Sequence, residues 1–130
     1  MPHLIIDHSA NMAALCDLAA LCDHMRRAMI DTGVFPLAGI RVRTHRADHV
    51  SIADGNPCHG YIDMTVKIGA GRDKDTRAKA SEQLFNAARD FLDDVMQTHP
   101  VGLSLTLVEL PPATSHKANT IRDFLAKGTT

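Results

Sequence analysis

The feature that most constrains the fold is a pattern that occurs twice: an alternating apolar strand, a long amphipathic helix and a second strand. In the first half, we expect strands at residues 2–6 and 38–45. The helix between them is expected to begin at Ser9 or Asn11 and to continue to about Asp31, because apolar residues recur there every three or four positions. A helix that connects two strands of one sheet makes a crossover, so the two strands should be parallel.

The second half repeats this order. Strands are expected at residues 61–68 and 101–108, on either side of a helix that begins at Asp75 or Thr76. We expect the helix to end at His99, since a residue before proline disfavours helical geometry. The second half therefore supplies another strand-helix-strand unit.

Together the halves predict an α/β (α+β) fold in which two β-α-β units form a four-stranded sheet with two helices on one face. We expect one domain over residues 1–130, with pseudo-repeats at about 1–59 and 60–112, and a C-terminal tail with a short helix around residues 120–126. The other face of the sheet would be bare, and its residues are not wholly polar. Such a face is typical of contact with another subunit, so a homo-oligomer is expected.

Composition excludes several classes of function. A net charge of −1 argues against a nucleic-acid surface or a polybasic membrane patch, and no apolar run has the length of a membrane span. The three cysteines form no C-x-x-C pair and cannot all be paired, which fits a reducing cytoplasm. The eight histidines lack any tight metal-ligand motif, so we expect neither a metal nor another cofactor.

Pro2 is the first candidate for chemistry. Initiator methionine is normally removed when the next residue is small, and its removal would leave Pro2 with a free secondary amine. A free α-amino group has a pKa of about 7.7–8.0, which an apolar site lowers, so such a group can act as a general base near neutral pH. The alternative is that Pro2 only opens an edge strand, where its missing N–H group costs nothing.

Three arginines are candidates for binding anions. Arg41 and Arg43 lie two apart on an expected strand and so point to the same face. Arg72 ends the bend Gly69-Ala70-Gly71, just before a helix, where backbone N–H groups favour anions. The alternative for each arginine is a solvated charge or an interface ion pair. Because a parallel β-α-β unit brings its strands together, Pro2 and the basic strand are expected to be neighbours.

Four blocks of the sequence resemble the 5-carboxymethyl-2-hydroxymuconate isomerase family of the tautomerase superfamily. They are Met1-Pro2-His3, Gly33-Val34-Phe35-Pro36-Leu37-Ala38-Gly39-Ile40-Arg41-Val42-Arg43, Ala53-Asp54-Gly55 and Met64-Thr65-Val66-Lys67-Ile68-Gly69-Ala70-Gly71-Arg72. The resemblance implies a homotrimer with active sites near subunit boundaries. It also implies a cofactor-free isomerase whose substrate is a small carboxylate anion of the bacterial homoprotocatechuate route of aromatic catabolism.

The resemblance also implies roles for individual residues. Pro2 matches the catalytic base, Arg41 and Arg72 match arginines that meet substrate carboxylates, and Arg43 matches a further basic position. The expected reaction converts a dienol polycarboxylate to its keto isomer. Two alternatives remain open: another chemistry of the superfamily (decarboxylation, hydration or dehalogenation), and a small-ligand-binding module without catalysis.

Overall fold

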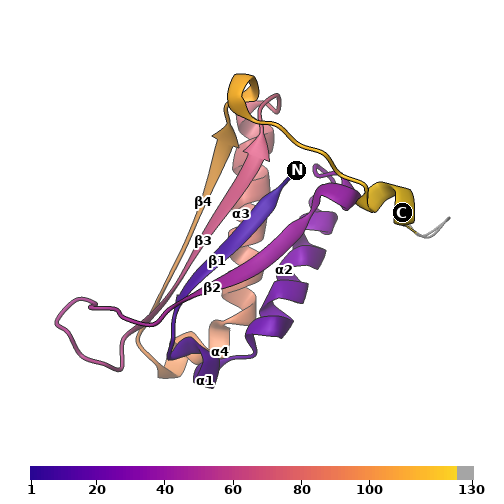
Figure 1. The fold of residues 1–130 in the computed structure, drawn as a ribbon. Coiled ribbons are helices and arrows are strands. Elements are labelled where there is room, and N and C mark those ends of the chain that lie inside the picture. Colours follow the sequence, from indigo (N-terminus) through magenta and orange to yellow (C-terminus); the bar gives the residue numbers. More distant parts are fainter. Residues whose placement is uncertain (126–130) are drawn as a thin grey trace.

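The computed structural model describes residues 1–125 and places four strands in one sheet with two long helices on one of its faces (Figure 1). The strands are β1 (His3–Ser9), β2 (Arg41–Ala47), β3 (Gly60–Gly69) and β4 (Val101–Leu110), in the order β2-β1-β3-β4. β1 and β2 pair in parallel, as do β3 and β4, and the two central strands β1 and β3 pair antiparallel. The predicted fold of two β-α-β units is confirmed.

The core lies between the sheet and the helices α2 (Leu18–Asp31) and α3 (Lys74–Phe91). Alternate residues of the two central strands point into it, and each is almost fully removed from solvent. They are Leu4, Ile6, Ile62, Met64, Val66 and Ile68. On the helices, the apolar stripe that contacts them includes Leu21, Met25, Leu84 and Ala88. The 2-residue period of the strands thus meets the 3.6-residue period of the helices in one apolar layer.

The first helical segment begins after Asn11 and ends at Asp31, as predicted, but it forms two helices and not one. A single turn, α1 (Met12–Leu15), is followed by extended backbone at Cys16. Asp17 then caps α2, since its carboxylate accepts a hydrogen bond from the N–H group of Ala20 at 3.0 Å. A carboxylate at this position satisfies a free N–H group of the first turn, which favours a new helix start over continuation.

The second helical segment starts slightly earlier than predicted, at Lys74, and is divided into two helices. Asp73 caps α3 by accepting from the N–H group of Thr76 at 2.7 Å, and the helix breaks at Leu92. A short helix, α4 (Asp93–Thr98), follows and ends next to His99, as the proline after it predicted. In the tail, the expected short helix is present as a 3-10 helix, η3 (Ile121–Phe124), and Ala126 lies outside the described residues.

The strand expected at residues 38–45 begins only at Arg41. The three residues before it, Leu37–Gly39, form the short turn η1, in which the N–H group of Gly39 donates to the carbonyl of Pro36 at 3.0 Å. As a result, the backbone of η1, and not a longer β2, lies beside the start of β1.

The face of the sheet opposite the helices carries mostly polar side chains and no covering element (Figure 1). We call it the open face. On it, the hydroxyl of Tyr61 donates to Asp7 at 2.6 Å, and Ser104 donates to Asp63 at 2.6 Å. Ile5 lies among them as a half-buried apolar residue. No helix within residues 1–125 is long and apolar enough to cross a bilayer.

Candidate active site

Pro2 is buried at the entrance of β1 and is held against η1 and β2. Its carbonyl accepts a hydrogen bond from the N–H group of Arg41 at 3.2 Å. A Cβ atom on Gly39 would lie 2.9 Å from the Cδ of Pro2, closer than such atoms approach in proteins. Gly39 therefore allows η1 to pack directly on the proline ring, and the expected closeness of Pro2 and the basic strand is observed.

Arg41 lies at the same end of the sheet. It is half-buried, pairs with His3 in the parallel register and donates from Nη1 to the carbonyl of Gly39 at 2.9 Å. Among residues 1–125, no carboxylate forms an ion pair with it. Its charge is thus fixed in place by backbone and is not neutralised by an acidic side chain.

Arg72 is held even more firmly. Its Nε and Nη2 atoms both donate to the carbonyl of Val34, at 3.1 and 2.9 Å, and Nη1 lies 3.3 Å from the carbonyl of Gly69. The guanidinium carbon lies 5.3 Å from the ring centre of Phe35, a cation–π contact. Each Nη atom carries a second hydrogen that these bonds leave free. Arg72 too has no ion pair within the described chain.

Arg43 is placed differently from the other two arginines. It is exposed on the open face, where Nη1 lies 3.0 Å from Nδ1 of His3 and Nε lies 3.1 Å from Nε2 of His45. Because a guanidinium only donates, both histidine nitrogens accept and both rings bond in their neutral form. Burial, followed by Arg43 and Arg41, lowers the pKa of His3, which favours that neutral form.

Two cavities open beside the amino terminus. The smaller has a volume of about 310 Å³ and includes His3, Gly69, His116 and Lys117 in its wall; the larger, of about 470 Å³, includes Gly39, Lys117, Asn119 and Arg122. Met1 and Lys117 contribute to both walls. Neither wall contains an aspartate or a glutamate. In a chain of net charge −1, this is a local concentration of positive charge suited to an anion.

The same surroundings act on the terminal amine. The amino group of the structure belongs to Met1, and burial lowers its pKa below the usual value of 8.0. Lys117, Arg41 and Arg72 lower the pKa further, because each positive charge disfavours protonation of the amine. The structure thus brings Arg41 and Arg72 to the amino terminus, and leaves Arg43 on the sheet beside them.

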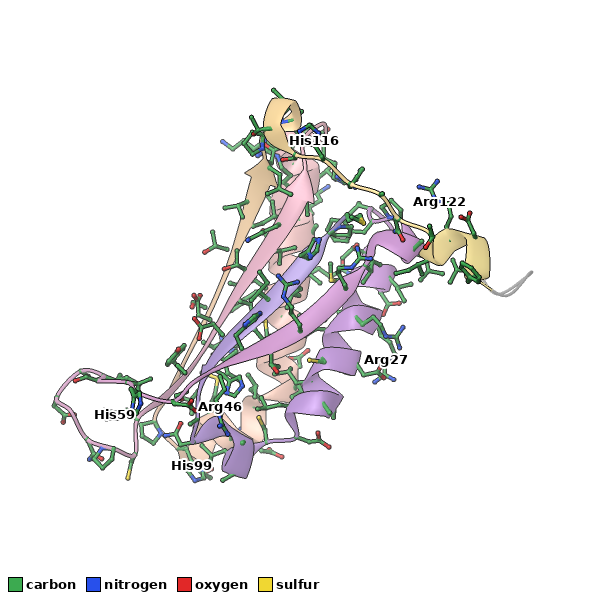
Figure 2. The ribbon with its side chains drawn as sticks, viewed as in Figure 1. Arg27, Arg46, His59, His99, His116 and Arg122 are labelled. Atoms are coloured by element: carbon green, nitrogen blue, oxygen red, sulfur yellow. The ribbon has the colours of Figure 1, made fainter. Side chains whose placement is uncertain are left out.

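The C-terminal tail supplies residues that sequence reasoning missed. Beyond β4 it passes the amino-terminal end of the sheet, and Figure 2 shows His116 and Arg122 on it. Asn119 attaches it by donating to the carbonyl of Ala38 at 2.8 Å. No local signal could have predicted this contact, because it joins the two ends of the chain and involves an irregular segment.

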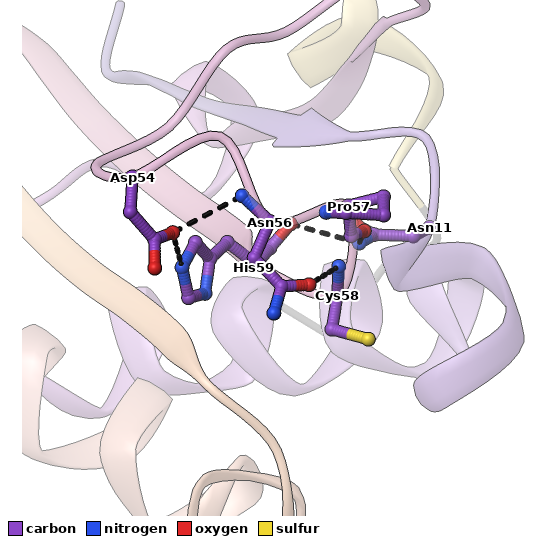
Figure 3. A network of polar contacts seen from close by, with 6 residues as sticks. All are labelled: Asn11, Asp54, Asn56, Pro57, Cys58 and His59. Carbon is purple, nitrogen blue, oxygen red and sulfur yellow. Dashed lines mark hydrogen bonds and ion pairs between the residues drawn. The ribbon is translucent and has the colours of Figure 1, made fainter.

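The block Ala53-Asp54-Gly55 lies elsewhere, in the loop between β2 and β3 that projects from the opposite end of the sheet (Figure 1). Figure 3 shows its polar contacts: Asp54 lies 2.6 Å from Nε2 of His59 and accepts from the N–H group of Asn56 at 3.1 Å. Asn11 ties the loop to the body by donating to the carbonyl of His59 at 2.9 Å. These hydrogen bonds stabilise the conformation of the loop. Within residues 1–125, no cluster of His, Cys, Asp or Glu is suited to a metal ion.

Comparison with known proteins identifies relatives of this chain in sequence and in fold. A profile of the 5-carboxymethyl-2-hydroxymuconate isomerase family matches residues 2–125. The 5-carboxymethyl-2-hydroxymuconate Delta-isomerase of Escherichia coli is 37% identical over 121 residues, which cover 93% of this chain and 96% of that protein. A crystal structure of a 5-carboxymethyl-2-hydroxymuconate delta-isomerase superimposes with a TM-score of 0.90 at 28% identity, covering 100% of this chain and 96% of the other.

A more distant likeness concerns the fold alone. A fused 4-OT that forms a symmetric trimer superimposes with a TM-score of 0.64 at 20% identity, covering 89% of this chain and 91% of the other. The arrangement of two β-α-β units is therefore shared with the tautomerase superfamily.

Proposed function

This chain belongs to the 5-carboxymethyl-2-hydroxymuconate isomerase family and is an isomerase, and on that premise we propose its substrate and mechanism. The substrate is an unsaturated 2-hydroxy (dienol) polycarboxylate such as 5-carboxymethyl-2-hydroxymuconate, which the enzyme converts to the keto isomer. The amine of Pro2, freed by removal of Met1, moves the proton. Neither a metal nor an organic cofactor takes part in this proposal.

One observation carries the proposal: Met1 lines two cavities whose walls, within the described residues, hold cations and no carboxylate. A polycarboxylate is the kind of ligand that such walls favour, since each charged carboxylate needs a compensating donor when it leaves water. The cavities, of about 310 and 470 Å³, also fall in the size range of small-ligand sites.

The reaction needs one group that first accepts and then donates a proton. The neutral secondary amine of Pro2 takes the proton of the substrate hydroxyl, the oxygen becomes a carbonyl, and the double bonds shift along the conjugated chain. The protonated amine then returns that proton to carbon, so the atoms balance and the product is an isomer. Burial and nearby cations lower the pKa of the Met1 amine. Once Met1 is removed, the same surroundings are expected to keep the amine of Pro2 neutral near pH 7.

The arginines bind and orient the substrate in this proposal. Arg41 and Arg72 hold carboxylates with the N–H groups that their backbone contacts leave free, and Arg43 provides a further positive charge beyond His3. Rigid guanidinium groups favour bidentate contacts, which fix the orientation of the ligand as well as its charge.

We also propose that the chain assembles as a homotrimer, with the open face turned towards neighbouring copies. The support is the uncovered face of the sheet and the fold shared with a trimeric fused 4-OT. In such a trimer, each active site would include residues of an adjacent subunit.

The proposal is tested with a panel of dienol carboxylates, each followed by ultraviolet absorbance as the conjugated dienol is consumed. We expect the fastest conversion with a tricarboxylate dienol, and a keto product of unchanged mass. A preparation shown by intact mass to lack Met1, yet unable to ketonise any member of the panel, would overturn the proposal.

A further inference from the structure

The C-terminal tail places a positive charge, that of Lys117, beside the amino terminus. Lys117 contributes to the walls of both cavities, whereas His116 contributes only to the smaller and Arg122 only to the larger. Among the charged groups, Lys117 has the largest effect in lowering the pKa of the terminal amine, ahead of Arg41 and Arg72. Lys117 therefore lies beside the position where the two cavities meet.

No carboxylate of the described part of the chain neutralises the charge of Lys117. Within residues 1–125 it forms no ion pair, in contrast to Arg77, which lies 2.9 Å from Glu109 near the same end of β4. A solvated lysine is ordinarily of little consequence. Here, however, the ammonium faces walls that hold no carboxylate, so an anionic ligand is the partner that the surroundings leave for it.

The backbone around Lys117 is anchored on both sides. Towards the C-terminus, Asn119 donates to the carbonyl of Ala38 at 2.8 Å and accepts from the N–H group of Ile121 at 2.9 Å. Towards the N-terminus, the turn Pro112–Thr114 follows directly on β4. Asn119 therefore acts as a positioning residue, because it fixes the tail to η1 and so keeps the lysine beside Met1 in the walls of both cavities.

The number of substrate carboxylates exceeds the number that Arg41 and Arg72 serve. A carboxymethyl-substituted muconate carries a carboxylate at each end of the diene and another on its side arm. Arg43 adds positive charge on the open face, where its guanidinium is bound to His3 and His45. With one arginine for each of two carboxylates, the remaining carboxylate is left to a cation of the cavity walls. A flexible ammonium at the mouth of both cavities can supply it as a point charge, without the fixed planar geometry of a guanidinium.

We propose that Lys117 binds one carboxylate of the substrate next to the amine of Pro2, and so makes the enzyme selective for tricarboxylate over dicarboxylate dienols. This inference rests on the proposed function, since it assigns a specificity-determining residue to the same site. It differs from that proposal in that it concerns which anion is preferred, not whether the amine moves a proton.

The test compares two substrates in the full-length chain: 5-carboxymethyl-2-hydroxymuconate, and 2-hydroxymuconate, which lacks the side-arm carboxylate. Lys117→Gln is expected to raise KM for the tricarboxylate roughly tenfold and to change KM for the dicarboxylate by less than about twofold. Lys117→Arg should restore most of the preference. Lys79→Gln removes a lysine from α3, away from both cavities, and should leave both KM values unchanged.

A second variant separates a direct role from a loss of folding. Asn119→Ala releases the tail from Ala38 without altering a charge, and should raise KM for the tricarboxylate selectively, as Lys117→Gln does. If Lys117→Gln changes both KM values equally, or neither, the proposal is wrong.

Failure of the proposed function would look different, because the unsubstituted chain would then convert neither dienol. In that event, calorimetric titration with tricarballylate and glutarate still tests Lys117. Tricarballylate binding weakened roughly tenfold in Lys117→Gln, with glutarate binding unchanged, would support the assignment. Equal binding of tricarballylate by the two proteins would overturn it.

Discussion

Arg41 and Arg72 are oriented by backbone carbonyl oxygens and not by carboxylates. Gly39 accepts from Arg41, while Val34 and Gly69 accept from Arg72. A carbonyl fixes the direction of a guanidinium yet leaves its full positive charge, whereas a carboxylate would cancel much of it. This difference is what allows two arginines to serve an anionic ligand in a chain that is slightly acidic as a whole.

The two arginines should differ in kinetics. If Arg41 holds a carboxylate remote from the reacting atoms, Arg41→Ala should raise KM more than it lowers kcat, because binding of substrate and transition state is lost alike. If Arg72 meets the carboxylate conjugated to the developing carbonyl, Arg72→Ala should also lower kcat. Each loss should cost roughly 1.5–3 kcal/mol, and steady-state kinetics on the dienol measures both.

Thermal unfolding provides the control for these variants. Arg72→Ala also leaves the carbonyl of Val34 without its donors, so some loss of Tm is expected there, whereas Arg41→Ala should have a smaller effect. Unchanged kcat and KM in both variants, in a protein that keeps its assembly, would contradict the assignment.

Secondary structure elements deliver these side chains to one end of the sheet. Pro2 directly precedes β1, β2 begins at Arg41, and Arg72 lies between β3 and α3. The closeness of Pro2 and Arg41 was predictable, because apolar periodicity places the strands and parallel pairing within the first half aligns their starts. The position of Arg72 at the same end also depends on the antiparallel pairing of β1 with β3, which the doubled pattern does not determine. Apolar periodicity does not reveal the Asp17 cap, which divides the first helical segment in two. Nor does it reveal the contact between the irregular C-terminal tail and η1.

Asp17 shows how local hydrogen bonding overrides periodicity. The apolar stripe runs through residues 12–31, yet the carboxylate of Asp17 accepts from the N–H group of Ala20 and starts α2 anew. Lys117 and Asn119 illustrate the other limit, since their partners lie at the opposite end of the chain. For Pro2 and Arg41, the strand pattern predicted the neighbourhood, whereas Arg72 was assigned to the same site only by the family resemblance. For the tail residues, neither gave a prediction.

Removal of the Asp17 cap should weaken α2 alone. We expect Asp17→Ala to lower the free energy of unfolding by about 1 kcal/mol, whereas Asp17→Asn, which can still accept the bond, should cost much less. Denaturant unfolding followed by circular dichroism measures both. Equal stability of the two variants would show that the carboxylate does not cap α2. The kinetics of the dienol should not change, because Asp17 is at the far end of α2 from η1.

At the scale of the whole molecule, the open face is the surface left for other copies of the chain. Ile5 lies on it next to Arg43 and Thr65 in the register of the sheet. In the proposed trimer, this apolar residue is buried between subunits. An isoleucine at this position adds no stability while the face is exposed to water, whereas its burial in a subunit interface stabilises the assembly.

Ile5→Lys should therefore shift the protein from trimer to monomer, because it places a positive charge beside Arg43 in the interface. Ala78→Lys, which adds the same charge at an exposed position of α3, is the matched control and should leave the trimer intact. Light scattering at the assay concentration measures the assembly. A stable and fully active monomer of the unsubstituted chain would contradict the proposed trimer.

The central claim is that the enzyme acts through the amine of Pro2. While Met1 remains attached, the nitrogen of Pro2 is an amide and has no basicity, and Met1 lines both cavities. With Met1 removed, the amine should titrate below 8.0, since burial and nearby cations both disfavour its charged form. Activity should then rise with increasing pH through that lowered pKa, as the neutral base forms.

The most direct test compares kcat for two proteins: the chain that lacks Met1, and a variant with a glutamine inserted between Met1 and Pro2. The inserted glutamine prevents removal of the methionine. Intact mass establishes the terminus of each protein. The extended chain should fold and assemble normally, yet lose at least about a hundredfold in kcat. Full activity in a chain whose mass shows the extension intact would contradict the account.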